Sequence, residues 1–546
     1  MQFVSYFDYT HYQAVLPPLR GDMDAQRHRV AIVGGGPIGF ALALGLARHG
    51  VASVVIEADD SVCTGSRAGC VTDRTLEIFD QYGVAEPTMK QGLPWSEGWS
   101  YYRTDEVFHL QVPQGPTKFP RLVNIQQCYV EQYMVDAIDR RRELIDVRWC
   151  SRVTDLKQHD DGVELSIATP AGNYRLAADW VIAGDGAHST VRKLLGARFV
   201  GTRYDGTYII ADIKMKSDLP AGRRAWFDPP SNPGATLLLH KHRDDLWRFD
   251  YQLREDEDPD EAVKPEHVLQ RIREHLQLMG ERQPWSPVWI SLYRASCLTL
   301  EQYRHGRVLL AGDAAHLVPI FGVRGMNSGI DDTHNLVWKL AFVIKGLAKP
   351  ALLDTYTAER VFAMRENMRH ASKSAEFMAP PTPAFKLMRQ AVLGLALRNE
   401  WIRRLVDPRQ SAAIGYPQSP LNQRGDDADF AAGPAPGVNA VDAPLPGGGF
   451  LSERMGPHFT ALVFEAAADS GAKAAAVLAP LAAGPLPFDY VTVDADSTLG
   501  ALYDAKPGTL YLFRPDGHLL ARWRRIDAAA VAAAMQACCE GDPACR

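Results

Sequence analysis

The spacing of apolar residues divides this chain into segments of different kinds. Residues 29–33 form a short apolar run, followed by a glycine-rich turn, a helical pattern to about residue 49 and a second apolar run at 53–56. A third apolar run at 308–311 leads into residues 330–344, where apolar positions recur at helical spacing. Short buried strands that alternate with helices are typical of a parallel α/β sheet. We therefore predict one α/β domain built from two separated stretches of chain.

The region between these stretches has a different pattern. Residues 208–215, 236–240 and 247–253 are short runs of the kind that form antiparallel strands. The last hundred residues return to an α/β pattern after a stretch rich in proline and glycine. The predicted division is an N-terminal extension (1–28), an α/β domain in two parts (29–195 and 293–410), an inserted antiparallel-sheet domain (196–292), a linker (411–449) and a C-terminal domain (450–546).

Length and composition exclude several classes of protein. The chain has 546 residues, too many for a single core, and its formal net charge of −6 leaves no basic surplus for binding nucleic acid. No apolar run reaches the roughly 18 residues of a membrane helix, and the N-terminus lacks signal-peptide features, so we expect no membrane insertion and a cytoplasmic location. The cysteines form no CxxC pair, and Cys538, Cys539 and Cys545 lack further ligands nearby. We therefore expect reduced thiols and no metal site.

The first chemical motif is Gly34-Gly-Gly-Pro-Ile-Gly39, which lies between the strand at 29–33 and a helix. In such a motif Gly34 makes a tight turn, Gly36 lets the backbone approach a pyrophosphate, and Gly39 lets the helix pack closely on the strand. Glu57 ends the second strand, about 20 residues later, where an acid accepts from a ribose hydroxyl. These parts together predict a dinucleotide-binding site.

Two further turns follow apolar runs later in the chain. Asp185-Gly-Ala-His-Ser-Thr-Val-Arg192 offers a cation near phosphates through Arg192, although a simple capped turn is the alternative. Gly312-Asp-Ala-Ala-His316 precedes a glycine-containing loop and a helix N-terminus, which favours negative charge. Asp313 cannot bind phosphate but can accept from a sugar hydroxyl. These turns suit a ligand with hydroxyls and a group that gains negative charge, such as a reduced flavin.

The motifs GxGxxG, DGxxSxxR and GDAAH…P…GMN occur in an order and spacing that resemble the class A flavoprotein monooxygenases, with the para-hydroxybenzoate hydroxylase fold. Arg514-Pro-Asp-Gly517 and Trp523-Arg524 are similar to the phenol-hydroxylase-like branch, which includes 3-(3-hydroxyphenyl)propionate hydroxylase. The resemblance implies an α/β (α+β) fold: a Rossmann-like FAD-binding domain of the glutathione-reductase type, an inserted antiparallel-sheet substrate domain and a C-terminal thioredoxin-like domain. Without CxxC, that last domain should do no dithiol chemistry.

The resemblance also assigns roles to single residues. Arg67 matches a flavin-contacting arginine, Gln127 a glutamine near the ribityl chain and pyrophosphate, and Asp313 the ribityl-binding aspartate. Met326 and Asn327 match backbone groups near the pyrimidine end of the flavin, and the positive helix end after Gly325 suits the anionic reduced flavin.

Several residues keep two interpretations. Arg74 and Glu77 either belong to the flavin-contacting segment or form an ion pair on a helix surface. The Tyr356-Thr-Ala-Glu-Arg360 segment fits a family pattern, but a structural role in a helix is favoured. His316 lies near the flavin or serves as a structural histidine at the turn.

The chain departs from the family beside the flavin. Close relatives have Pro-Pro where this chain has Pro319-Ile320, and often Gly-Gln-Gly where it has Val323-Arg324-Gly325. Pro319 remains a candidate for contact with the substrate. Arg324 either attracts an anionic substrate or holds the loop.

The resemblance implies an FAD-dependent monooxygenase that hydroxylates a phenolic aromatic substrate with NADH or NADPH and O2 through a C4a-hydroperoxyflavin. A base or polarising donor must activate the phenol, and the candidates on the middle-domain strands are Tyr208, His240, Arg248 and Tyr251. The alternatives are another flavin oxidoreductase on this fold, such as a reductase or epoxidase, and a flavin-binding protein that mainly binds a partner. A homodimer is an open question.

Overall fold

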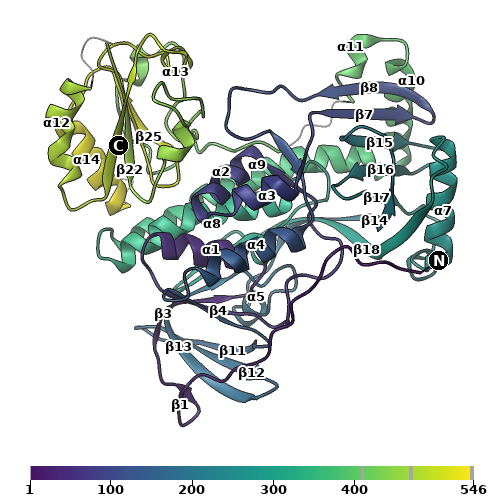
Figure 1. The fold of residues 1–546 in the computed structure, drawn as a ribbon, viewed down its shortest axis with the longest axis horizontal. Coiled ribbons are helices and arrows are strands. Elements are labelled where there is room, and N and C mark those ends of the chain that lie inside the picture. The colour runs from purple at the N-terminus through teal and green to yellow at the C-terminus, as the bar shows by residue number, and fades with distance from the viewer. Residues whose placement is uncertain (1, 407–410, 467–470, 542–546) are drawn as a thin grey trace.

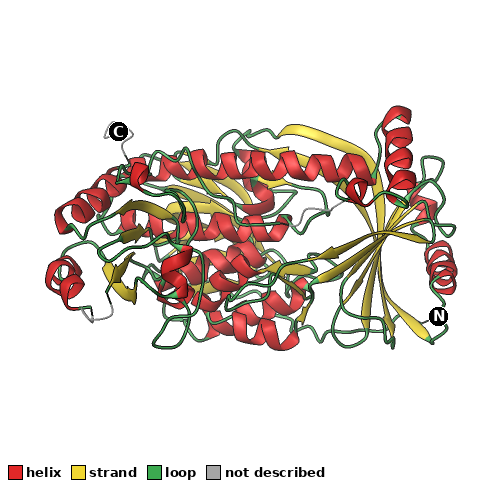
Figure 2. Cartoon of the chain, turned by 90° about the horizontal axis from the view of Figure 1, so that it is seen from above, coloured by secondary structure: helices red, strands yellow, loops and turns green. Residues whose placement is uncertain are grey.

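The computed structural model describes residues 2–406, 411–466 and 471–541, so Cys545 and the ends of two predicted domains lie outside the described residues. Three layered parts follow one another along the long axis (Figure 1). A large α/β part lies in the middle, an antiparallel sheet lies at one end, and the C-terminal unit lies at the other. The long helices α8 (Gly325–Ile344) and α9 (Asp354–Met378) run between the two ends (Figure 2).

The central sheet has the mixed α/β architecture that the apolar runs predicted. Its parallel core pairs β10, β4, β3, β13 and β20, so strands from both stretches of chain meet in one sheet. Residues 30–33 are almost completely buried because helices cover the sheet. The strands of this sheet are β1 (Leu19–Arg20), β2 (Met23–Asp24), β3 (His28–Val33), β4 (Ser53–Ile56), β10 (Ile145–Arg148), β11 (Arg152–Gln158), β12 (Val163–Thr169), β13 (Gly172–Ala183), β19 (Arg304–His305) and β20 (Val308–Leu310).

Helices and short elements complete this part. α1 packs beside both α4 and α8. The N-terminal extension also packs here, since Tyr12 stacks on Trp149 with ring centroids 4.3 Å apart. The other elements are α1 (Pro37–Arg48), α2 (Asp73–Tyr82), α3 (Ala85–Gln91), α4 (Gln127–Asp139), α5 (Thr190–Leu194), the 3-10 helices η1 (Gly312–Ala314) and η2 (Pro350–Leu353), and a small sheet of β5 (Cys70–Thr72), β6 (Leu93–Pro94) and β9 (Leu122–Asn124).

The second sheet has eight strands in the order β21-β18-β14-β17-β16-β15-β7-β8, and one face packs on helix α7. Two of its strands, β7 and β8, come from residues 97–111, outside the predicted range 196–292; Tyr101 stacks on Trp226, which ties this hairpin to the sheet. The elements are β7 (Glu97–Tyr102), β8 (Asp105–Gln111), β14 (Val200–Met215), β15 (Arg223–Phe227), β16 (Thr236–Lys241), β17 (Leu246–Gln252), β18 (Trp285–Thr299), β21 (His316–Leu317), α6 (Pro259–Ala262), α7 (Pro265–Leu278), α10 (Pro383–Ala396) and α11 (Glu400–Arg403).

The C-terminal unit is a four-stranded sheet in the order β23-β22-β24-β25. Strands β22 and β23 are parallel, and the other two pairings are antiparallel. Part of the predicted linker joins its core, because Ala443 and Leu445 are buried against it. Its elements are β22 (Phe459–Glu465), β23 (Phe488–Asp494), β24 (Leu510–Phe513), β25 (Leu519–Trp523), α12 (Ala472–Ala482), α13 (Thr498–Leu502) and α14 (Ala528–Glu540), with η3 (Asp427–Asp429) and η4 (Leu451–Arg454) before them. Within the described part of the chain, no helix has the length and apolar character needed to cross a membrane.

Candidate cofactor and substrate site

The glycine-rich turn after β3 leaves the N-terminus of α1 open. Gly34 has φ +99°, and a side chain there would lie 2.7 Å from the Gly184 carbonyl oxygen. A Cβ at Gly39 would collide with the Gly34 carbonyl, so both glycines are needed for the close approach of helix and strands. No side chain caps α1 at Gly36, and a Cβ there would meet only Glu131 Oε1, at 4.0 Å. The free N–H groups of this helix end are therefore available to an anion.

Glu57 lies beside this turn, as the dinucleotide motif predicted. Its carboxylate accepts from the Gly35 N–H and, at 2.7 Å, from the Asp59 N–H. Burial raises the pKa of Glu57, while these two N–H groups act in the opposite direction. The carboxylate is thus fixed at the end of β4, and its contact with a ribose stays a prediction.

Arg192 connects the second and third motifs. Its guanidinium donates to the carbonyl of Ala314 at 3.1 Å and to that of Ala187 at 2.7 Å. Both terminal nitrogens therefore bind the protein itself, so the structure gives Arg192 a role in joining the two turns. Asp185 accepts from the Val191 N–H at 3.1 Å through Oδ2, and its buried Oδ1 has no partner among the described residues. That oxygen remains available to a ligand hydroxyl.

The third motif is held by a buried aspartate that the sequence interpretation did not single out. Asp332 Oδ2 accepts from the Gly312 N–H at 2.9 Å and bonds His316 Nε2 at 2.6 Å, and Oδ1 accepts from Arg360 Nε at 2.6 Å. Burial opposes ionisation, but His316 and Arg360 hold the pKa of Asp332 below its usual value. His316 thus has the structural role, and the turn presents Asp313, which is exposed although its neighbours on both sides are buried.

Asn327 fixes the loop at the start of α8. Its Oδ1 accepts from the Thr72 N–H at 3.0 Å and from the Thr75 hydroxyl at 2.6 Å, and its Nδ2 donates to the Val323 carbonyl at 3.0 Å. No side chain caps this helix end, and Val323 has φ +61°, an unusual conformation for a β-branched residue. Arg324 is buried and donates to Asn367 at 3.0 Å, which supports the interpretation that it holds the loop. Gly325 and Met326 form the first turn of the helix.

Gln127 and its neighbour Glu131 hold the loop that carries Arg67. Gln127 Oε1 accepts from the Ala68 N–H at 3.2 Å, and its Nε2 donates to Glu131 at 2.7 Å. Glu131 in turn accepts from the Cys63 N–H at 2.6 Å, and burial raises its pKa to about 7. The Arg67 side chain is exposed, while its carbonyl accepts from Arg248 of the second sheet. This loop therefore joins the two sheets.

One face of the second sheet forms a polar wall opposite that loop. Neighbouring strands bring Asp212, Arg248 and His240 into one row across the sheet. Arg248 donates to Asp250 at 2.8 Å, and His240 Nε2 lies 3.8 Å from the same carboxylate. Asp212 accepts from Gln126 at 3.2 Å; burial raises its pKa to about 7, and Arg248 acts in the opposite direction. Asp212 and Asp250 were missed, although an acid inside an otherwise apolar strand was a usable signal.

The tyrosine candidates lie on opposite faces of this sheet. Tyr208 is on the polar wall, with its ring 5.4 Å from that of Phe321 in the loop before α8, and its buried hydroxyl has no partner among the described residues. Tyr251 points to α7, where the guanidinium of Arg271 lies 4.9 Å from its ring centroid. The choice of Tyr251 as a candidate to activate the phenol is therefore corrected, because strand alternation places it on the face opposite the polar wall. Pro319 is buried in the loop near Phe321.

The comparison with known families settles the cofactor class. Residues 27–371 match the family model described as an FAD binding domain. The chain belongs to this family. Its glycine turns, the accessible Asp313 and the two uncapped helix ends fit FAD, and the chain is an FAD-dependent oxidoreductase of the flavoprotein monooxygenase group that the motifs predicted.

Curated relatives and solved structures agree with this family. The chain is 28% identical to 6-methylpretetramide 4-monooxygenase of Streptomyces rimosus, over 94% of each chain. It is 30% identical to 3-(3-hydroxy-phenyl)propionate/3-hydroxycinnamic acid hydroxylase of Mycolicibacterium smegmatis, over 61% of this chain and 58% of the relative. The structure of the flavin-dependent monooxygenase PieE with FAD and substrate matches with a TM-score of 0.77 and 22% identity, over 94% of this chain and 98% of that one. At that identity the structural likeness shows the fold alone.

Proposed function

We propose that this oxidoreductase hydroxylates a phenolic aromatic substrate with NADH or NADPH and O2. The observation that carries the proposal is the meeting of the FAD-binding loops with the polar wall. Arg248 of the wall donates to the Arg67 carbonyl, and Tyr293 donates to the Val318 carbonyl at 3.2 Å beside the α8 loop. When bound, FAD would accept hydride from the nicotinamide and activate O2 for transfer of one oxygen atom. A substrate between loops and wall would lie next to it.

The wall can hold a phenol and accept its proton. Burial, together with Arg223 and Arg248, holds the pKa of His240 well below its usual value, so this imidazole is neutral near pH 7 and can accept a hydrogen bond from the phenol rather than its proton. Asp212, with a pKa of about 7, is the group of the wall that suits acceptance of the proton. The positive charge of Arg248 would stabilise a phenolate. Tyr208, with its unpartnered hydroxyl, supplies apolar surface and one hydrogen bond to the substrate.

We also infer that the C-terminal unit is thioredoxin-like. One parallel pair, β22 and β23, joined by α12, and an antiparallel β24–β25 hairpin on the other side of β22 support this assignment. Cys538 and Cys539 are buried in α14 and adjacent in sequence. Adjacent residues on a helix do not face each other, so these thiols offer no dithiol site.

A panel of phenols tests the proposed reaction. The expected result is faster NAD(P)H oxidation with one or more phenols and a product that contains one atom of labelled O2, with peroxide measured to separate coupled from uncoupled turnover. Product oxygen from water would reject the proposal, and NAD(P)H oxidation that no phenol accelerates would favour the reductase or partner-binding alternatives. Asp313→Ala is the control for FAD dependence, because it should lose FAD and with it the reaction; full retention of FAD would reject the ribityl assignment of Asp313.

A further inference from the structure

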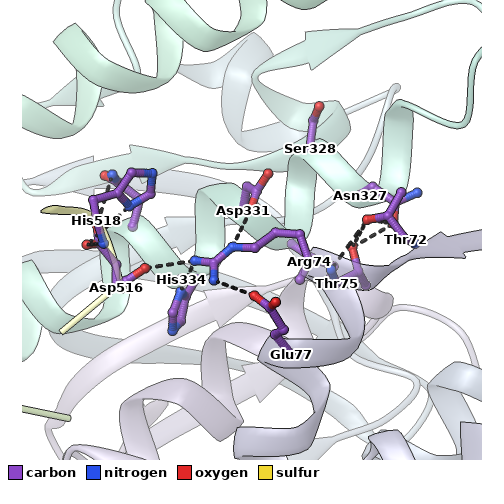
Figure 3. A network of polar contacts seen from close by, with 12 residues as sticks. Thr72, Arg74, Thr75, Glu77, Asn327, Ser328, Asp331, His334, Asp516 and His518 are labelled. Carbon is purple, nitrogen blue, oxygen red and sulfur yellow. Dashed lines mark hydrogen bonds and ion pairs between the residues drawn. The ribbon is translucent and has the colours of Figure 1, made fainter. Parts of the chain in front are cut away.

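Three sequence motifs that the FAD site itself does not use meet in one place. They are the Arg74–Glu77 pair of α2, Glu359 of α9, and the turn Arg514-Pro-Asp-Gly517, called here the RPDG turn, between β24 and β25. Figure 3 shows Arg74, Glu77 and Asp516 beside residues of α8. The RPDG turn belongs to the C-terminal unit, whereas the other residues belong to the FAD-binding part. This place is therefore a polar contact between two parts of the molecule.

The deeper half of the contact is completely buried. Arg514 donates to Glu359 Oε1 at 2.5 Å and to Asp516 Oδ2 at 2.6 Å. Lys339 of α8 donates to Glu359 at 2.6 Å, and Asn335, one turn earlier, donates to the same oxygen at 2.7 Å. Burial opposes ionisation of Glu359, but Arg514 and Lys339 hold its pKa well below the usual value. All the charges are therefore paired, which such burial requires.

The less buried half of the contact is connected by hydrogen bonds to the loop at 323–327, beside the proposed flavin site. Arg74 donates to the Asp516 carbonyl at 2.7 Å and to Glu77 at 3.1 Å, and its guanidinium lies 3.6 Å from Asp331 of α8. The next residue, Thr75, donates to Asn327. Asn327 donates to the Val323 carbonyl in the loop at the uncapped end of α8. Arg74 and Thr75 thus connect the RPDG turn to Asn327, one of the proposed flavin contacts.

Apolar packing also holds the C-terminal unit against α8. Trp338 and Phe342 of α8 are buried in one cluster with Phe459 and Leu512 of the C-terminal sheet. This burial stabilises the contact without fixing its geometry, since hydrophobic contact is not directional. Buried ion pairs add little net stability because desolvation is costly, but their hydrogen bonds fix orientation. The charged contact therefore fixes how the two parts are oriented more than it strengthens their association.

We propose that the RPDG turn is a positioning element of the FAD site. It holds the first turn of α2 through Arg74 and the middle of α8 through Glu359, and so sets the place of the loop at 323–327. The proposal rests on the assignment of FAD to this site and not on any substrate. It gives the C-terminal unit a part in cofactor binding, which its distance from the glycine motifs would not suggest.

Variants of Arg74 in the full-length chain test the proposal. Arg74→Gln keeps α2 and the deeper ion pairs but removes the bonds to Asp516 and Glu77. We expect the apoprotein to bind FAD roughly tenfold more weakly and the visible spectrum of bound FAD to shift. Arg74→Lys keeps the positive charge but lacks the planar set of N–H donors of the guanidinium, so we expect a smaller loss of FAD affinity. The readouts are quenching of flavin fluorescence, the flavin spectrum and the unfolding temperature.

Arg524→Gln is the matched control. Arg524 pairs with Asp504 at 2.7 Å within the C-terminal unit, so its loss should destabilise that unit while leaving FAD affinity within about twofold. The proposal is overturned if Arg74→Gln binds FAD as the wild type does with an unchanged spectrum, or if Arg524→Gln loses as much affinity. If Arg74→Gln does not fold, wild-type FAD affinity in Arg74→Lys overturns it equally. A wild-type chain that binds no FAD would instead reject the proposed function.

Discussion

At the scale of single residues, Asp212 is a group of the polar wall whose pKa lies near neutral pH. An acid whose pKa is higher in the folded protein than in the unfolded chain holds its proton longer when folded. Stability therefore falls as pH rises from the ordinary value of 3.8 to the folded value of about 7, and the loss is complete above that pH. Asp212→Asn cannot ionise, so it should gain stability relative to the wild type across this interval, by up to about 4 kcal/mol.

Unfolding free energies of both proteins at pH 5 and pH 8 measure this difference. Asp256→Asn is the control, because Asp256 is an exposed acid of the same part of the chain and pairs only at its surface with Arg254, at 3.5 Å. The Asp212→Asn difference should change more between the two pH values than the Asp256→Asn difference. An Asp212→Asn difference that stays constant would contradict the raised pKa of Asp212.

At the scale of elements, alternation along a strand decides which side chains can reach the substrate. Tyr208 and Tyr251 are both buried, yet only Tyr208 lies on the wall that faces the FAD-binding loops. Tyr208→Phe removes the hydroxyl from the proposed site, and we expect phenol-stimulated NAD(P)H oxidation to fall by about threefold to tenfold, or coupling to drop. Tyr251→Phe should leave both unchanged. Equal effects from the two variants would contradict this placement.

Local motifs could be predicted from the sequence more accurately than the sheet face on which a side chain lies. The positions of the glycine turns, of Glu57 and of Asp313 in the fold could be predicted because local backbone requirements leave a pattern in a few consecutive residues. Their contacts with FAD stay predictions. The face on which Tyr251 lies could not be predicted. Period-2 alternation divides the residues of a strand between two faces of the sheet, but it does not say which face lies towards the FAD-binding loops. The hairpin at 97–111 was missed for a related reason: its place in the second sheet depends on pairing with β15, about 120 residues away in sequence.

At the scale of the whole molecule, long-range contacts were the least predictable. Arg514 and Glu359 are 155 residues apart, and each belongs to its own short sequence motif. Neither motif carries information about the other, since their contact follows from how the C-terminal sheet packs on α8. The same holds for Asp332, which orders the third motif from 20 residues further along the chain. Sequence motifs thus identify the parts proposed to touch the cofactor, and tertiary packing supplies the parts that hold them.

The FAD site and the RPDG turn should affect each other in both directions. If the RPDG turn positions the FAD site, bound FAD must in turn stabilise the contact of that turn with α2 and α8, because coupling between two sites acts equally in both directions. Hydrogen exchange in residues 514–518 should therefore slow when FAD is added to the apoprotein. Strand β23, at the far edge of the same sheet, serves as the internal control and should change little. Equal slowing in both segments would indicate general stabilisation, and no slowing at 514–518 would show that the C-terminal unit and the FAD site are independent.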